Sequence, residues 1–479
     1  MNKAKKNLAF QVMYQFITVL TPLITSPYLS RVLGPAQLGV FSSTYSYVCY
    51  FMLVCKLGVE TYGCREIAKV SGDKQRTSEV FFGIYRVQLF FSFLSVAVYY
   101  LFLSIAGERL DNGYIMALQG LWIVSALTDI NWMLFGLEEF VISTVRNTAI
   151  KIVTIILVFC LVKTPQDLDR YILIMAGGQI LSMVVIWPYA AKRISYIRVS
   201  IRNSLTHLKP LLYFFVPVMA MSVFHIMDKT MLGLMSSEVE SGYDYNVDRL
   251  GNIAIGVSLG INTVMLPRIT NSIAGGNTNV SGTLEKSYEL VIASAIAISV
   301  GLAAIGPLFV PVFFGDSFMP CVDLISVFAV ALIAKSISGC ICNQCLIPMD
   351  EEKHYVRAVL AGAGINLVCN YFLIRRYAAM GATIGTVIAE IAVLIIVLIK
   401  AREKSNMRRM GLDFLRYAVI GCVMFTAVRL VSSRMAHTWG NLLLVIALGG
   451  AVFAAGVLAV ALLDRNSVFA ELIRKKKRT

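Results

Sequence analysis

Several ionisable side chains stand inside long apolar runs of this sequence, where a charge needs a partner. Lys229 and Lys335 are the deep cations, and Asp129, Asp228 and Glu390 are the deep acids. A charge near the middle of a bilayer costs about 2.5–3.5 kcal/mol on insertion scales. Buried ammonium groups bind anions, buried carboxylates bind a proton or sodium, and the two kinds also neutralise each other. These residues therefore indicate a path for a charged substrate or a coupling ion.

Four more cations lie closer to the ends of apolar runs, namely Arg31, Lys56, Arg86 and Arg268. An arginine can hold an anion through two parallel hydrogen bonds, whereas a lysine acts as a point charge. The long stems of these side chains also allow the charge to reach the membrane surface, where it fixes the orientation of a helix. The sequence leaves both interpretations open.

Two asparagines, Asn366 and Asn370, are one helical turn apart and therefore share a helix face. Their carbonyl oxygens suit a hard cation. Hydrogen bonding between helices explains them equally well. We interpret the lone His225 as a packed or hydrogen-bonded side chain rather than a proton relay.

Composition excludes a water-soluble enzyme. Of the 479 residues, 57% are apolar and 15% are charged, whereas soluble domains carry about 25% charged residues. Together with a mean hydropathy of +0.73, this predicts an all-α polytopic membrane protein. The net charge of +15 would indicate nucleic acid in a soluble protein. Here, cationic inner loops and anionic membrane lipids explain it, and we expect no nucleic-acid partner.

Fourteen segments are long and apolar enough to cross a membrane, at about 20 residues each. The first follows the basic MNKAKKN with no cleavage site, so we expect an uncleaved span. Prolines inside spans, such as Pro307, are tolerated where neighbouring helices or a water-filled cavity satisfy the freed backbone groups. The segments are 8–30, 38–57, 80–105, 113–135, 143–163, 170–190, 213–235, 246–267, 288–312, 322–346, 356–375, 378–400, 415–434 and 441–463.

The distribution of basic residues predicts the orientation. With the N-terminus inside, the inner segments carry 31 Lys and Arg residues and the outer segments carry 9. This asymmetry places both termini in the cytoplasm. The acidic segment 236–249 is then an outer loop.

Basic stretches divide the chain into four parts. Residues 191–212 carry five basic residues with isoleucine and leucine at helical spacing, which predicts an amphipathic helix on the cytoplasmic surface. It separates a six-helix lobe at 1–190 from a second at 213–400, two parallel repeats in the manner of some transporters. Residues 401–479 form two further spans and a basic tail.

The ten cysteines do not predict a disulfide framework, since most stand inside apolar runs. Cys340, Cys342 and Cys345 are clustered, but no histidine or second cysteine pair completes a metal site. We expect no bound metal.

A series of motifs runs in order over nearly 400 residues. They are PLITSPYLSRVLGP at 22–35, GVETYGCREIAK at 58–69, WMLFGLE at 132–138, MDKTMLG at 227–233, MLPR at 265–268, Asn343-Gln344, Asn366, Asn370 and GATIGT at 381–386. In these motifs the chain resembles bacterial polysaccharide flippases of the Wzx type, which carry O-antigen or capsule repeat units. These belong to the superfamily of multidrug, oligosaccharidyl-lipid and polysaccharide (MOP) exporters.

This resemblance implies two six-helix lobes around a central cavity that opens to each side of the bacterial cytoplasmic membrane in turn. It implies a substrate in which pyrophosphate links an oligosaccharide to a polyprenol, and contact with the polysaccharide polymerase machinery. The expected pyrophosphate ligands are Arg31, Lys56, Arg86, Lys229, Arg268 and Lys335. The expected ion-coupling residues are Asp228, Asn366, Asn370 and Glu390, with H⁺ or Na⁺ as the coupling ion and no other cofactor.

Two other functions are open to a polytopic membrane protein of this composition. A membrane glycosyltransferase or polymerase usually needs a sizeable outer loop or a cytoplasmic domain with acids, and none is visible, so we do not expect an enzyme. A multidrug or metabolite exporter of the same superfamily is the nearer alternative, although it would favour an acidic cavity. For Asp228, ion coupling and permanent charge balance with Lys229 or Lys335 both remain open.

Overall fold

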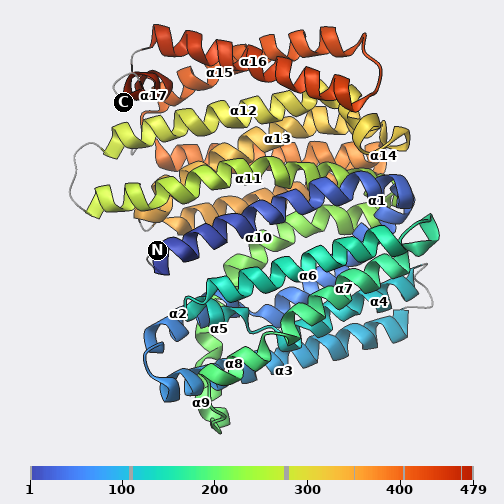
Figure 1. Ribbon diagram of the computed structural model, residues 1–479, viewed down its shortest axis with the longest axis vertical. Coiled ribbons are helices and arrows are strands. Elements are labelled where there is room, and N and C mark those ends of the chain that lie inside the picture. Colours follow the sequence, from blue (N-terminus) through green and yellow to red (C-terminus); the bar gives the residue numbers. More distant parts are fainter. Residues whose placement is uncertain are drawn as a thin grey trace. The chain divides into compact units, whose positions relative to one another are not determined.

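The structure, a computed structural model, consists of α-helices joined by short turns (Figure 1). It describes residues 3–106, 112–274, 280–349, 351–402, 405–464 and 466–476, and none of these belongs to a β-strand. The predicted all-α fold is confirmed. The chain forms two compact units, Met1–Leu234 and Met235–Thr479.

The first unit contains ten helices within its described residues. They are α1 (Lys3–Lys56), α2 (Val59–Val70), α3 (Lys74–Ala106), α4 (Gly113–Ser125), α5 (Asn131–Gly136), α6 (Phe140–Leu161), α7 (Leu168–Val184), α8 (Trp187–Arg193), α9 (Ile201–Thr206) and α10 (Leu208–Met235). A buried cluster joins α2, α3 and α5, with Phe81 stacked on Trp132. This cluster makes the short helices α2 and α5 a fixed support for the longer ones.

The second unit contains seven helices within its described residues. They are α11 (Glu238–Ala274), α12 (Val280–Phe313), α13 (Cys321–Ile341), α14 (Glu352–Ala401), α15 (Met407–Ser432), α16 (Trp439–Leu463) and α17 (Val468–Lys476). Helix α12 packs against α13 on one side and α15 on the other (Figure 1).

Two long helices have the length of two of the predicted crossings each. In the described residues, ten helices are long and apolar enough to cross a membrane, and a bent pair within 201–235 makes an eleventh. Two of the ten, Leu20–Val70 and Lys353–Ala401, have 51 and 49 residues, more than twice the roughly 20 that one crossing needs. They are broken at Gly34 (φ 72°) and Ala378 (φ 49°). The predicted segment 246–267 lies within the 37 residues of α11.

A proline inside α12 is matched by an arginine on its neighbour. Pro307 has no N–H, so it cannot donate to the carbonyl of Ala303 four residues earlier. Arg429 of α15 donates its Nη2 to that carbonyl at 3.0 Å. The expectation that neighbouring helices satisfy backbone groups freed by proline is therefore confirmed at this position.

The single amphipathic helix predicted for 191–212 is wrong. Helix α8 ends at Arg193, residues 194–200 are not helical, and α9 and α10 follow separately. Contacts to α3 replace helical hydrogen bonds: Ser195 N–H donates to the Ser78 hydroxyl at 2.9 Å, and Arg86 donates to the carbonyl of Val199.

The loop conformation predicted for 236–249 is also wrong, because α11 begins within this segment at Glu238, whereas its predicted outer side stays a prediction. The Ser237 hydroxyl accepts the backbone N–H of Glu240 at 3.3 Å, and carboxylates in the first turn favour a helix N-terminus. The predicted lobe boundaries stay a prediction. The two compact units are defined by packing, whereas the lobes of a transporter are defined by the parts that move.

Candidate functional site

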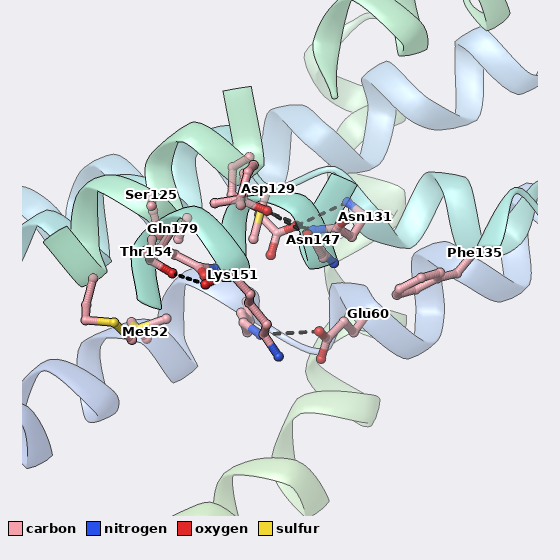
Figure 2. A pocket seen from close by; sticks show the side chains of 17 residues that line it. Met52, Glu60, Ser125, Asp129, Asn131, Phe135, Asn147, Lys151, Thr154 and Gln179 are labelled. Carbon is pink, nitrogen blue, oxygen red and sulfur yellow. Dashed lines mark hydrogen bonds and ion pairs between the residues drawn. The ribbon is translucent and has the colours of Figure 1, made fainter. Parts of the chain in front are cut away.

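A polar pocket of about 400 Å³ lies wholly within the first unit. Its wall is formed by the end of α1, the start of α2, the break between α4 and α5, and one face each of α6 and α7. Four charged side chains line it: Lys56, Glu60, Asp129 and Lys151 (Figure 2). The volume falls within the range of about 300–1,000 Å³ that is usual for small-molecule sites.

A sharp turn brings the first charged pair together. Leu57 (φ 38°) and Gly58 (φ 72°) are consecutive residues in the left-handed region, between the end of α1 and the start of α2. A side chain at position 58 would place its Cβ 2.8 Å from the backbone nitrogen of Phe215, so only glycine fits. Across this turn, Lys56 Nζ lies 3.3 Å from Glu60 Oε1.

The second acid, Asp129, lies in the break between α4 and α5, where its backbone is extended (ψ 108°). Its Oδ1 accepts the backbone N–H of Asn131 at 3.1 Å and the side-chain amide of Asn131 at 2.8 Å. The carboxylate thus caps the start of α5, and the cap holds it at the pocket wall.

A buried arginine fixes the amides behind these charges. Arg146 of α6 is 9% exposed, and its Nη2 donates to Asn131 Oδ1 at 2.8 Å and to Asn147 Oδ1 at 2.9 Å. The hydroxyl of Ser182 on α7 also donates to Asn147 Oδ1, at 2.7 Å. One connected network therefore joins α5, α6 and α7 and sets the shape of the wall.

The pocket is electrically balanced. Lys56 pairs with Glu60, and Asp129 lines the same wall. Lys151 extends from α6 towards the edge where Glu60 lies (Figure 2). Two cations and two carboxylates thus line the same pocket. The described residues contain no group of three or more His, Cys, Asp or Glu side chains placed to hold a metal ion. The arrangement is a set of hydrogen-bond donors and acceptors suited to binding.

Of the five predicted pyrophosphate ligands whose side chains the structure describes, only Lys56 lines this pocket. Arg31 and Arg86 are exposed on α1 and α3, and Arg86 donates to the carbonyl of Val199. Lys229 is partly buried on α10 in the first unit, and Lys335 is partly buried on α13 in the second. The side chain of Arg268 lies outside the described part of the structure.

The predicted ion-coupling residues are divided between the units. Asp228 is partly buried on α10 in the first unit, next to Thr230, whose hydroxyl donates to Ser46 at 2.8 Å. The other three, on α14 in the second unit, are buried. They are Asn366, Asn370 and Glu390.

The hydrogen bond between the two asparagines lies within α14, so the predicted hydrogen bonding between helices stays a prediction. Asn370 Nδ2 donates to Asn366 Oδ1 at 3.1 Å, and Asn370 packs directly against Gly385, on the far side of the break in α14. The coupling roles of all four residues stay predictions.

Most of the pocket was not predicted from the sequence. The distribution of basic residues assigned Arg146 and Lys151 to the inner side, but both lie inside α6. A usable signal was present: on α6 the polar residues Asn147, Lys151 and Thr154 recur at helical spacing within an apolar span. Gln179 and Ser182 repeat the pattern on α7.

Comparison with known proteins gives a consistent result. Residues 4–273 match the family described as "Polysaccharide biosynthesis protein". The chain is 22% identical over 397 residues to a protein of Shigella dysenteriae named "Putative O-antigen transporter", covering 82% of this chain and 99% of that protein.

Solved structures share the fold. The structure titled "Lipid II flippase MurJ, inward closed conformation" superimposes with a TM-score of 0.75 at 15% identity, covering 95% of this chain and 100% of that one. An inward-facing "multidrug resistance MATE family transporter of the MOP superfamily" gives a TM-score of 0.60 at 17% identity, covering 82% of this chain and 95% of that one. At these identities the likeness concerns the fold alone.

Proposed function

Because the chain belongs to the polysaccharide biosynthesis protein family, we propose that it moves lipid-linked oligosaccharides across the cytoplasmic membrane of a bacterium. Its substrate is an oligosaccharide repeat unit joined by pyrophosphate to a polyprenol. Similarity to a protein named as an O-antigen transporter supports this substrate class.

The observation that carries the proposal is the pocket of the first unit. Lys56, Glu60, Asp129 and Lys151 stand in a bundle of membrane-crossing helices, where each charge is costly without a function or a partner. A hydrated substrate head group that must cross the bilayer needs such a polar lining. In this proposal the lining is exposed to the two sides of the membrane in turn.

The remaining features of the proposal concern orientation, partners and coupling. Both termini lie in the cytoplasm, and the protein delivers its cargo to the polymerase machinery on the outer side. Transport is coupled to H⁺ or Na⁺, with Asp228 as the first coupling residue and Glu390, Asn366 and Asn370 as further ones. The cations Lys229, Lys335, Arg31 and Arg268 remain the proposed ligands of the pyrophosphate.

A second candidate function is export of an organic cation, because Glu60 and Asp129 place two carboxylates at the pocket. Deleting the gene in its own host separates the two functions. A flippase predicts loss of surface polysaccharide and accumulation of lipid-linked repeat units inside the cell, with unchanged drug sensitivity. Normal surface polysaccharide with increased sensitivity to cationic drugs would refute the flippase.

A further inference from the structure

The pocket of the first unit has a charge distribution unlike that of a phosphate site. A pyrophosphate is held by an excess of cationic and N–H donors. Here Lys56 Nζ is 3.3 Å from Glu60 Oε1, and Asp129 lines the same pocket. The buried guanidinium of Arg146 points its Nη2 at amide oxygens. An anion entering this pocket would meet two carboxylates as well as two ammonium groups.

Neutral hydroxyl groups fit the same lining better. A sugar hydroxyl both donates and accepts, so it can bridge a carboxylate and an ammonium or amide group. Acceptor capacity remains on the acids, since the recorded bonds of Asp129 use Oδ1 only and that of Glu60 uses Oε1 only. On α7, no hydrogen bond is recorded for the amide of Gln179 within the described residues, and it lines the cavity (Figure 2).

Apolar groups complete a lining of the kind that sugar rings require. Phe135 lies at one end of the pocket and Met52 at another (Figure 2). A sugar ring presents C–H groups on its faces and hydroxyls around its edge, so it is bound by an apolar contact together with polar ones. Small-molecule sites in general combine such surfaces with a few placed polar groups.

We propose that this pocket holds sugar rings of the lipid-linked oligosaccharide, while the pyrophosphate lies outside it. The proposal rests on the function proposed above and assigns Lys56 to the glycan instead of the pyrophosphate. Gln179, Lys151 and Asp129 are then specificity-determining residues, since they contact the part of the substrate that differs between surface polysaccharides.

Binding to two lipids tests this assignment. The purified full-length protein in detergent is titrated with lipid-linked oligosaccharide extracted from the producing cells, and with undecaprenyl pyrophosphate that carries no sugar. Gln179→Leu removes the amide with little change in volume. We expect it to weaken binding of the glycosylated lipid about tenfold, because it removes about one net hydrogen bond. Affinity for the sugar-free lipid should be unchanged.

Two further variants serve as a second test and as a matched control. Thr154→Val keeps the shape of the α6 wall and removes one hydroxyl, so it should act in the same direction as Gln179→Leu. Gln166→Leu makes the same chemical change at an exposed position outside the pocket and should change neither affinity.

The outcomes that contradict the proposal differ from one another. Equal loss of both lipids in the Gln179→Leu variant would place the pyrophosphate in the pocket. If both Gln179→Leu and Thr154→Val bind the glycosylated lipid with full affinity, the glycan does not bind in this pocket. If the wild-type protein binds neither lipid, the proposed function itself is wrong, and the assignment of the glycan is wrong with it.

Discussion

Replacing Arg429 with methionine should destabilise the contact between α12 and α15, because it leaves the carbonyl of Ala303 without its donor. That carbonyl accepts Arg429 Nη2 at 3.0 Å only because Pro307 has no N–H to offer it. A hydrogen bond to a charged group contributes about 1.5–3 kcal/mol, whereas polar contacts between membrane helices average about 0.6 kcal/mol. We therefore expect Arg429→Met to lower the free energy of unfolding by about 1–2 kcal/mol.

A double-mutant cycle tests the cause as well as the size of this effect. In the Pro307→Ala background, the new backbone N–H can bond to Ala303, so Arg429→Met should cost much less there than in the wild type. Unfolding is followed in mixed micelles by titration with dodecyl sulfate. Arg434→Met, at an exposed position just beyond α15, is the matched control and should change stability by less than about 0.5 kcal/mol. Effects that add within about 0.5 kcal/mol would refute the link between the arginine and the proline.

Four further predictions concern topology, substrate, coupling and the C-terminal helix. In a cysteine-free background, an impermeant thiol reagent applied from outside should label a cysteine at Ser237 but not at Arg202; the reverse pattern would overturn the orientation. Lys335→Ala should reduce surface polysaccharide at a normal protein level, with partial recovery in Lys335→Arg, since the forked guanidinium places its donors differently. Asp228→Asn should abolish the dependence of transport on the ion gradient while substrate still binds, whereas a folding defect relieved by neutralising a lysine would indicate charge balance. Glu289→Gln should make α17 several-fold more sensitive to limited proteolysis, because the Glu289 carboxylate accepts Ser467 Oγ and Val468 N–H at its start; unchanged cleavage would count against this contact.

Hydropathy was sufficient for the helices of this protein because a membrane crossing is a property of a continuous segment. The positions of fourteen apolar runs depend on about 20 neighbouring residues each, and tertiary contacts do not move them. The errors fell where one side chain decides the local structure. Ser237 begins α11 inside a predicted loop, and Ser78 and Arg86 of α3 hold residues 194–200 out of a helix.

The pocket shows why the candidate site was harder to predict than the fold. Lys56 and Glu60 are four residues apart, a spacing that makes an ion pair in a continuous helix, yet here the pair forms across a turn built by Leu57 and Gly58. Its other neighbour, Asp129, is brought near by the break between α4 and α5. Counting cations along the sequence therefore predicted a positively charged site. In the folded chain, carboxylates at the interruptions between helices, which hydropathy does not detect, line the same pocket. For a chain of this kind, the polarity of a binding site is set less by the charges inside the spans than by where the spans are interrupted.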